Sequence, residues 1–332
     1  MASQCLTVRQ LCPCCCCLRW RCCCPSDTRS GVVITGKQLG EGVNGIIYPA
    51  KLPARDDIPA RTQLAVKIAA PWSEDVMQTE GAFMQKLQGC IGIPRLFFSG
   101  LLPEVYFNSR PPSHFGKIHR RRALVMERFA VDLMHWCNEE LTELTVRQLS
   151  YQLINILQGV HKFAILHLDI KPENIMFKRK MSPRDVKFRS PNEEQDIYLI
   201  DFGLAADLRG GLISRALGHP AFRSRSQHWG DPQGRKDDLE IVANMALLML
   251  GQAPWISLAA HLEYLLESGE PEGSPEFQEV LDQIGSSKAA TFSDPPKTFP
   301  DWLSGFIRHI NDMEVAYAPE NYDYERSFFI EK

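Results

Sequence analysis

The sequence predicts an α+β protein in which a small β-rich half precedes a larger helical half. Short runs rich in β-branched and aromatic residues, separated by Gly, Pro and Asp, occupy the chain from Val32 to about residue 128. After Asp132, apolar residues instead recur at the spacing of a helix with one buried face. With 332 residues, of which 44% are hydrophobic, the chain can bury a core without disulfides or a structural metal.

The overall composition excludes several classes of protein. The 37 Lys and Arg residues against 40 Asp and Glu give a formal net charge of -3, a globular balance that excludes wholesale disorder. This charge also argues against a general nucleic-acid binder, so no specific nucleic-acid partner is expected. The longest uncharged apolar run, 241–251, is shorter than the roughly 18 residues that a membrane-spanning helix needs. Nothing in the sequence specifies an oligomeric state.

The cysteines divide the chain into a tail and a body. Nine of the 11 cysteines fall in the first 24 residues, and only Cys90 and Cys137 lie beyond them. Two separated thiols form no disulfide framework, which indicates an intracellular protein, cytoplasmic or nuclear. Residues 1–30 are predicted to be a flexible, basic, Cys-rich extension. Reversible palmitoylation, which would give membrane association, fits adjacent thiols in a basic segment; metal binding and an inert low-complexity tail are the alternatives.

The secondary structure of the body follows from the pattern of apolar residues. Strands are expected at 32–39, 46–50, 63–69, 96–100 and 123–128, in an antiparallel sheet, with a helix at 74–87. In the second half, 141–160 and 241–250 have helical spacing. The charged segments 104–122 and 179–196 are interpreted as loop insertions. We find no internal repeat.

Two motifs of the first half could bind phosphate. Gly-Glu-Gly-Val-Asn-Gly at 40–45 would let backbone N–H groups approach phosphate oxygens, although glycine clusters also mark ordinary hairpins. Lys67 lies inside the apolar strand 63–69, where an unpaired ammonium would cost several kcal/mol. Glu80 on the following helix, or nucleotide phosphates, could pair with it; the alternative is a lysine that reaches out to solvent.

Two motifs of the second half could perform phosphoryl transfer. In His-Leu-Asp-Ile-Lys-Pro-Glu-Asn at 167–174, Asp169 can accept a hydroxyl proton, Lys171 can neutralise a phosphoryl group, and Asn174 can ligate a metal ion. Asp201 ends the apolar strand 197–200 and begins Asp-Phe-Gly, where it can supply a carboxylate to Mg²⁺.

A further acidic motif, Arg-Lys-Asp-Asp-Leu-Glu at 235–240, opens the helix at 241–250. Asp237 and Asp238 could simply cap that helix, or one of them could support a catalytic loop.

In this order, the motifs form the signature set of protein kinases, and the chain resembles a eukaryotic-type protein kinase from about Val32 to its C-terminus. Within that superfamily it is similar to the casein kinase 1 branch, which includes the vaccinia-related kinases. The residues responsible are 87–94, 235–240, and Phe-Arg-Ser-Arg-Ser at 222–226 in place of Ala-Pro-Glu. The resemblance implies a bilobal kinase fold at 31–332, with an N-lobe at about 31–128 and a C-lobe at about 129–332.

The resemblance also implies roles for individual residues. Asp169 would be the catalytic base, Lys171 would lie near the γ-phosphate of ATP, and Asn174 and Asp201 would ligate Mg²⁺. Lys67 would bind the α- and β-phosphates with Glu80 as its partner, and Asp238 would brace the catalytic loop. Further nucleotide-binding positions would be Gly40, Gly42 and Gly45 over the phosphates, and Ala65, Met126, Glu127 and Phe129 around the adenine.

Departures from the family pattern limit what can be carried over. Leu168 stands where many kinases have an arginine that pairs with a phosphorylated activation loop, so we predict no activation by that route. His219 replaces the usual threonine, and a preference for primed substrates is therefore not transferred. The nearby arginines keep the area positive, which would suit an acidic peptide or simply a solvated loop: Arg209, Arg215, Arg223 and Arg225.

The complete set of charged residues predicts ATP- and Mg²⁺-dependent phosphorylation of Ser or Thr in protein substrates. A pseudokinase that acts as a nucleotide-binding scaffold is the alternative, although a scaffold has no evident reason to retain every charge that transfer needs.

Overall fold

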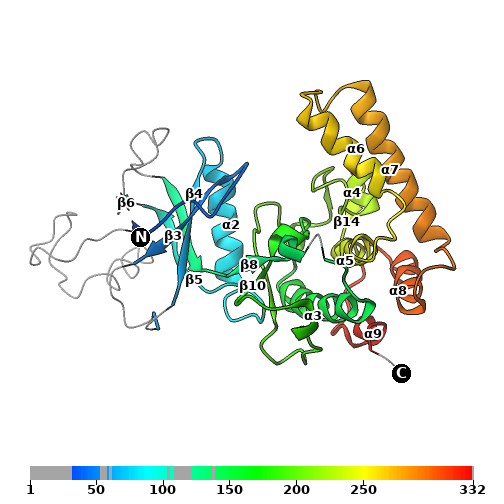
Figure 1. The fold of residues 1–332 in the computed structure, drawn as a ribbon, viewed down its shortest axis with the longest axis horizontal. Coiled ribbons are helices and arrows are strands. Elements are labelled where there is room, and N and C mark those ends of the chain that lie inside the picture. The colour runs from blue at the N-terminus through cyan, green and yellow to red at the C-terminus, as the bar shows by residue number, and fades with distance from the viewer. Residues whose placement is uncertain are drawn as a thin grey trace, which may run out of the picture.

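A computed structural model describes residues 32–52, 58–59, 62–102, 105–107, 121–136 and 139–330 of the chain. The Cys-rich segment 1–30, predicted to be flexible, lies outside the described residues, as does Cys137. Figure 1 shows a small lobe built on a curled sheet and a larger lobe built from helices. The predicted α+β, bilobal architecture is confirmed.

The small lobe is a seven-stranded sheet in the order β5-β7-β4-β3-β1-β6, with β2 paired to β3. All its pairings are antiparallel except that of β1 with β6. The strands are β1 (Val32–Ile34), β2 (Gly40–Gly42), β3 (Gly45–Lys51), β4 (Leu64–Ala69), β5 (Leu96–Leu101), β6 (Val105–Phe107) and β7 (Arg122–Glu127). Strand β4 lies in the middle and is buried along its whole length, which places Lys67 in the interior of the lobe.

One predicted strand is divided. The sequence pattern predicts a continuous strand at 32–39, but β1 ends at Ile34 and the next strand begins at Gly40. Opposite the break lies Pro49 of β3, which has no N–H to donate to a neighbouring strand. The chain bends there, at Gly36, where an added Cβ would lie 3.0 Å from the Pro49 ring. The prediction of one strand was therefore wrong because it ignored the partner strand.

Helix α2 (Glu74–Lys86) packs on the sheet against β5 and β7. Gly81 allows the close approach, since a Cβ at that position would lie 2.3 Å from Ser99 Oγ. At the start of the helix, the Glu74 carboxylate accepts a hydrogen bond of 3.0 Å from the backbone N–H of Arg122. The helix is thus fixed to the sheet near its first turn and in its middle, and Glu80 lies on its buried face.

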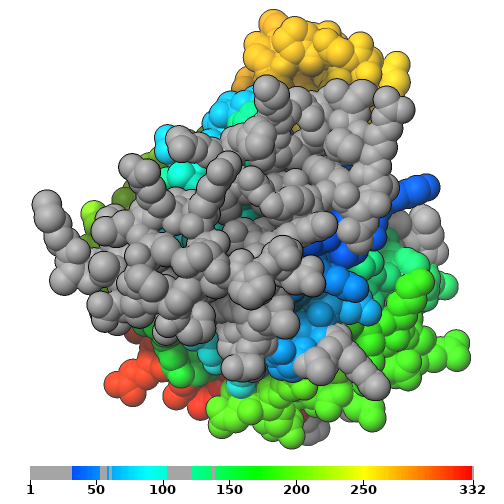
Figure 2. Space-filling view, turned by 90° about the vertical axis from the view of Figure 1, so that its left-hand side faces the viewer, coloured from blue at the N-terminus to red at the C-terminus, as the bar shows by residue number. Residues whose placement is uncertain are grey.

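The larger lobe is organised around two buried helices, α3 (Glu143–Lys162) and α5 (Arg235–Met249), which pack on each other. The other helices are α4 (Arg225–Trp229), α6 (Ile256–Glu267), α7 (Pro275–Ser293), α8 (Asp301–Asp312) and α9 (Asp323–Ser327), and four short 3₁₀ turns are η1 (Leu133–Trp136), η2 (Pro172–Asn174), η3 (Pro183–Asp185) and η4 (Leu208–Gly210). Seen from the small-lobe end, α6 and α7 project beyond the rest of the molecule (Figure 2). None of the described helices is long and apolar enough to cross a bilayer.

Short paired strands in the larger lobe position its loops. They are β8 (Val131–Asp132), β10 (Ile175–Phe177) and β11 (Ile197–Leu199) in one sheet, β9 (Ile165–Leu166) with β12 (Ala206–Asp207), and β13 (Ile213–Ser214) with β14 (Pro232–Gln233). The pairing of β10 with β11 brings the end of the 167–174 loop beside Ile200, whose N–H donates to Asn174 O at 2.9 Å. Two loops distant in sequence therefore lie next to each other.

Candidate active site

The buried lysine of β4 is paired with two carboxylates. Lys67 Nζ lies 3.0 and 2.8 Å from the two carboxylate oxygens of Glu80 and 3.0 Å from Asp201 Oδ1. Burial lowers the pKa of Lys67, but the two carboxylates raise it more, so the net pKa is above its ordinary value. Burial raises the pKa of Glu80, and the ammonium of Lys67 offsets only part of that rise. Lys67 therefore forms ion pairs with Glu80 of the small lobe and with Asp201 of the Asp-Phe-Gly turn.

The carboxylate of Asp201 is held in a turn with φ of +63°. Its Oδ1 accepts a hydrogen bond of 3.1 Å from the backbone N–H of Gly203. The next side chain, Phe202, is fully buried, with its ring 4.7 Å from the ring of His167. Burial raises the pKa of Asp201, but Lys67 and the Gly203 amide outweigh it and hold the net pKa below its ordinary value. Asp201 is therefore an anion at neutral pH, with 35% of its side chain exposed.

Asp169, Lys171 and Asn174 form a second polar group on the adjoining loop. Lys171 Nζ lies 3.0 Å from Asp169 Oδ2, and Asn174 Nδ2 donates to Asp169 O at 2.8 Å and to Asp169 Oδ2 at 3.1 Å. The loop also joins the first group, because His167 Nε2 donates to Ile200 O at 3.0 Å, one residue before Asp201. The six charged and amide side chains that the sequence singled out thus lie in two contiguous sets.

A buried carboxylate behind this loop holds its backbone. Asp238 accepts hydrogen bonds of 2.8 Å from the N–H groups of His167 and Leu168 and from His161 Nε2. His161 Nδ1 in turn lies 2.5 Å from the hydroxyl of Tyr322, within hydrogen-bonding distance. This chain of contacts connects the C-terminal part of the protein to the catalytic loop, and the sequence analysis missed its last two members, His161 and Tyr322.

Asp237, the residue before Asp238, caps the helix, which is the other role that the sequence left open for this motif. Asp237, in the first turn of α5, accepts through Oδ2 from the backbone N–H of Gly234, the residue before the helix, at 2.7 Å. Two adjacent carboxylates of one motif therefore divide the two functions: Asp237 caps the helix, and Asp238 supports the loop.

The glycines of the 40–45 motif are not equivalent. Gly45 has φ of +156°, and a Cβ there would lie 2.3 Å from Ile68 O, so the close pairing of β3 with β4 requires glycine. At Gly40 and Gly42, an added Cβ would meet no atom within 4 Å. The structure therefore leaves the space beside these two glycines open, as a ligand lying against the hairpin would need.

The residues expected around an adenine lie where β7 leaves the sheet. Ala65 and Met126 face each other across β4 and β7. The Glu127 carboxylate forms an ion pair with Lys178 of the larger lobe at 3.3 Å. The Phe129 ring packs on Tyr198 at 4.6 Å, and the Phe129 N–H donates to no described residue. A backbone donor is thus available at the start of the larger lobe.

The four arginines that follow the Asp-Phe-Gly turn contribute less free positive charge than their number suggests: Arg209, Arg215, Arg223 and Arg225. Arg209 pairs with Asp207 at 2.5 Å, and Arg225 pairs with Glu240 at 3.1 Å. Arg223 is buried, which lowers its pKa to about 10. Arg215 alone of the four has an exposed side chain with no ion pair to a described residue. The structure thus weakens the case for a broad basic surface that would select acidic peptides.

The replacement residue His219 faces the catalytic loop as a neutral ring. Burial and the positive charge of Lys171 lower its pKa to about 4. Its Nδ1 accepts from the N–H of Ala221 at 3.2 Å, and its Nε2 lies 3.6 Å from a carboxylate oxygen of Glu263. The activation segment therefore approaches Lys171 without adding a charge.

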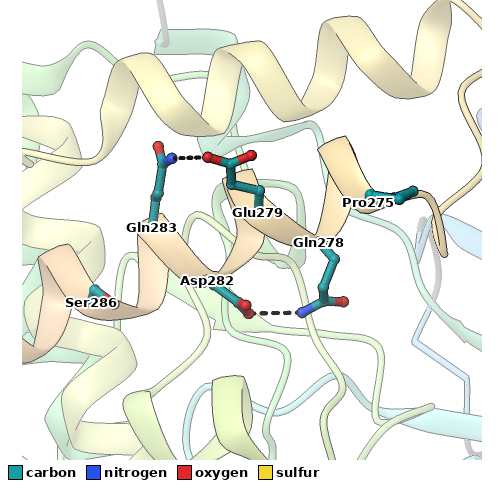
Figure 3. Close-up of a pocket in the computed structure, with 6 residues that line it drawn as sticks. All are labelled: Pro275, Gln278, Glu279, Asp282, Gln283 and Ser286. Atoms are coloured by element: carbon teal, nitrogen blue, oxygen red, sulfur yellow. Dashed lines mark hydrogen bonds between the residues drawn. The ribbon is translucent and has the colours of Figure 1, made fainter.

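A hollow on the surface of the larger lobe contains none of the candidate site residues. It lies along α7, and its side chains bond to one another (Figure 3): Gln278 donates to Asp282 at 2.7 Å and Gln283 to Glu279 at 3.3 Å. These are helix neighbours four residues apart, which explains the pairing without a ligand.

The donor set at Asp201 suits a hard cation. Asp201 offers a carboxylate, and Asn174 uses its amide N–H groups on Asp169, which leaves its side-chain oxygen for another partner. Carboxylate and amide oxygens with nearby phosphates are the surroundings that Mg²⁺ prefers. These two residues therefore fit the ion that kinases use with ATP.

Comparisons with known proteins agree with this geometry. Residues 33–225 match the family described as "Protein kinase domain". Casein kinase I homolog 3 of Saccharomyces cerevisiae is 25% identical over 259 residues, covering 68% of this chain and 46% of that protein. Casein kinase I homolog 2 of the same yeast is 24% identical over 309 residues, covering 87% and 47%. Casein kinase I homolog 1 of Schizosaccharomyces pombe is 23% identical over 312 residues, covering 89% and 59%. The chain spans about half the length of the curated relatives it matches.

Proposed function

Because the chain belongs to the protein kinase family, in its casein kinase 1 branch, we propose that it transfers the γ-phosphoryl group of ATP to Ser or Thr hydroxyls of protein substrates. The observation that carries the proposal is the joining of Lys67, Glu80 and Asp201 in one charged group beside Asp169. Phosphoryl transfer depends on positioning and on neutralising phosphate charge, and this arrangement supplies both.

Each residue has a chemical task in this proposal. Lys67, held by Glu80, binds the inner phosphates of the nucleotide. Asp201 and Asn174 hold Mg²⁺, which neutralises charge on the phosphates when it is bound. The ion pair between Lys67 and Asp201, 3.0 Å apart, would give way to contacts of Lys67 with phosphate and of Asp201 with Mg²⁺ when the nucleotide binds.

The acceptor side of the reaction is assigned to the catalytic loop. The acceptor oxygen forms a bond to the γ-phosphorus while the bond to the β,γ-bridging oxygen breaks, and ADP leaves. Asp169 accepts the proton of the hydroxyl, and Lys171, 3.0 Å from Asp169, neutralises the phosphoryl group in transit. Asp238 holds the backbone of this loop through the N–H groups of His167 and Leu168.

The test is transfer of labelled phosphate from ATP to a mixture of protein substrates. Wild-type protein is expected to label Ser and Thr well above an Asp169→Asn variant, and Glu173→Gln, an exposed neighbour on the same loop, is expected to match wild type. Labelling equal to that of Asp169→Asn would overturn the enzymatic proposal. Thermal stabilisation by Mg·ATP without labelling would instead identify a nucleotide-binding scaffold.

We propose an intracellular location, cytoplasmic or nuclear, with membrane association through acylation of the tail cysteines. The proposal rests on the cluster of nine cysteines among basic residues in the first 24 positions. Replacing those nine cysteines with serine is expected to release the protein from the membrane fraction of cells. An unchanged membrane fraction would contradict acylation, and stoichiometric zinc in the purified protein would favour the metal-binding alternative.

A further inference from the structure

The tip of the β2–β3 hairpin is fastened to the loop that precedes α2. The Asn44 carbonyl accepts from the N–H of Ala70 at 3.1 Å and from Ser73 Oγ at 2.6 Å, and the Val43 carbonyl accepts from Trp72 Nε1 at 3.0 Å. Three hydrogen bonds from one short segment thus fix the backbone of both tip residues. The backbone from which each tip side chain extends is therefore held in place.

The two tip side chains face different surroundings. Val43 is 81% exposed, whereas Asn44 is half-buried. A Cβ placed on Gly203 would lie 3.1 Å from Asn44 Nδ2 and 3.0 Å from Asp201 Oδ1, so these two atoms are no more than about 6 Å apart. The Asn44 carboxamide thus lies over the Asp-Phe-Gly turn, and it makes no hydrogen bond to another described residue.

The distance suits an oxygen atom shared between the amide and a bound ion. Mg²⁺ holds its oxygen ligands at about 2.1 Å, so a second ligand of an ion bound to Asp201 lies within about 4 Å of that carboxylate. A hydrogen bond from an amide N–H to such an oxygen spans about 2.9 Å. An oxygen can therefore satisfy both distances at once, and the anionic phosphate next to the ion is the group that would supply it.

We propose that Asn44 is a further nucleotide-binding residue whose side-chain N–H donates to an oxygen of the terminal phosphate of a nucleoside triphosphate. This inference rests on the proposed function, since it assumes that Asp201 holds the ion. A carboxamide at the hairpin tip gives the phosphate a neutral, directional donor beside the charge of Lys67. It also gives the protein a means of distinguishing a triphosphate from a diphosphate before transfer.

The experiment is calorimetric titration of the full chain with a non-hydrolysable Mg·ATP analogue and, separately, with Mg·ADP. The test variant is Asn44→Leu, which keeps the shape and removes the donor. The matched control is Asn192→Leu, the same substitution at an exposed asparagine outside the hairpin. Asn44→Leu is expected to weaken binding of the triphosphate about tenfold and to change ADP binding less than twofold. Asn44→Asp, which places a negative charge against phosphate, is expected to weaken triphosphate binding further. Asn192→Leu is expected to bind both nucleotides as wild type does.

Three results would overturn the inference. Unchanged triphosphate affinity in Asn44→Leu would show that the amide does not contact phosphate, and an equal loss for both nucleotides would place any contact on the inner phosphates. An equal loss in Asn192→Leu would show that the effect does not come from the hairpin tip. Wild-type protein that binds neither nucleotide would instead remove the proposed function on which the inference rests. Thermal unfolding without nucleotide is expected to be the same in all variants, because Asn44 contributes no side-chain hydrogen bond to the described fold.

Discussion

Asp201 and Asp238 are two carboxylates beside the same loop, and their surroundings differ. Asp201 has 35% of its side chain exposed and faces the ammonium of Lys67, whereas Asp238 is fully buried and accepts from His161 and from two backbone N–H groups. A metal ion can replace Lys67 as the partner of Asp201, and a phosphate can replace Asp201 as the partner of Lys67. No ligand can reach Asp238. In the proposed function, the charges that would meet the ligand are thus separate from the charge that keeps the loop in place.

The largest effect on activity is expected at Lys67, the ion-pair partner of Asp201. Lys67→Met should lower phosphate transfer by about a hundredfold to a thousandfold, because it removes a fixed positive charge from the phosphates. Lys86→Met, at an exposed lysine on α2, is the control and should keep wild-type transfer. Steady-state labelling assays measure both, and a loss of less than about tenfold in Lys67→Met would break the distinction between the two carboxylates.

The next effect concerns stability. Asp238→Asn should lower the free energy of unfolding by about 3 kcal/mol, since it removes a buried anion that three donors share. Asp231→Asn, at an exposed position before α5, should change it by less than about 0.5 kcal/mol. Urea denaturation checks both values. A stable Asp238→Asn protein that lacks only activity would show that Asp238 resembles Asp201 after all.

His167, which lies between the two carboxylates, makes stability depend on pH. Burial lowers its pKa below the ordinary value of 6.5, so the folded protein favours the neutral ring. The stability from this residue is present above pH 6.5 and is lost as the pH falls below it, by up to about 1.4 kcal/mol per pH unit. His167→Phe should flatten the pH dependence of the unfolding free energy between pH 6.5 and 5, whereas the exposed His135→Gln should not. An unchanged slope in His167→Phe would contradict this assignment.

The smallest effect is expected at the end of the hydrogen-bond chain. Tyr322→Phe removes one hydroxyl from His161 and should cost about 1 kcal/mol of stability. Transfer should fall a few fold while nucleotide affinity is unchanged, because the change reaches the catalytic loop only through Asp238. Tyr324→Phe, at a ring that is 60% exposed, is the control. Equal values for Tyr322→Phe and wild type in both assays would remove Tyr322 from the bracing chain.

Local chemistry made part of this arrangement predictable from the sequence. A single lysine in an apolar strand needs an anionic partner, and Glu80 on the following helix was the natural candidate, with nucleotide phosphates as the other. The loop at 167–174 and the Asp-Phe-Gly turn were recognisable because their polar residues follow apolar strands at fixed spacing. The pattern of apolar residues likewise predicted the ends of helix α2 and strand β4 to within one residue.

The rest depends on contacts between distant parts of the chain. Tyr322 meets His161 across 161 residues of sequence, and no local pattern marks either of them as part of the site. The backbone carbonyl of Asn44 is held by Ala70 and Ser73, which a reading of the glycine motif alone does not include. The strand predicted at 32–39 was broken by Pro49 of another strand. In each case, the deciding partner lies outside the segment that carries the pattern.

The most direct test of the central claim is nucleotide binding with and without Mg²⁺. Wild-type protein should bind a non-hydrolysable ATP analogue at least tenfold more tightly with Mg²⁺ than with EDTA, because Asp201 and Asn174 supply the oxygen ligands of the ion. Asp201→Asn should lose most of that difference. Equal affinity in Mg²⁺ and EDTA for wild-type protein, or a full Mg²⁺ effect in Asp201→Asn, would show that these side chains do not form a metal and nucleotide site.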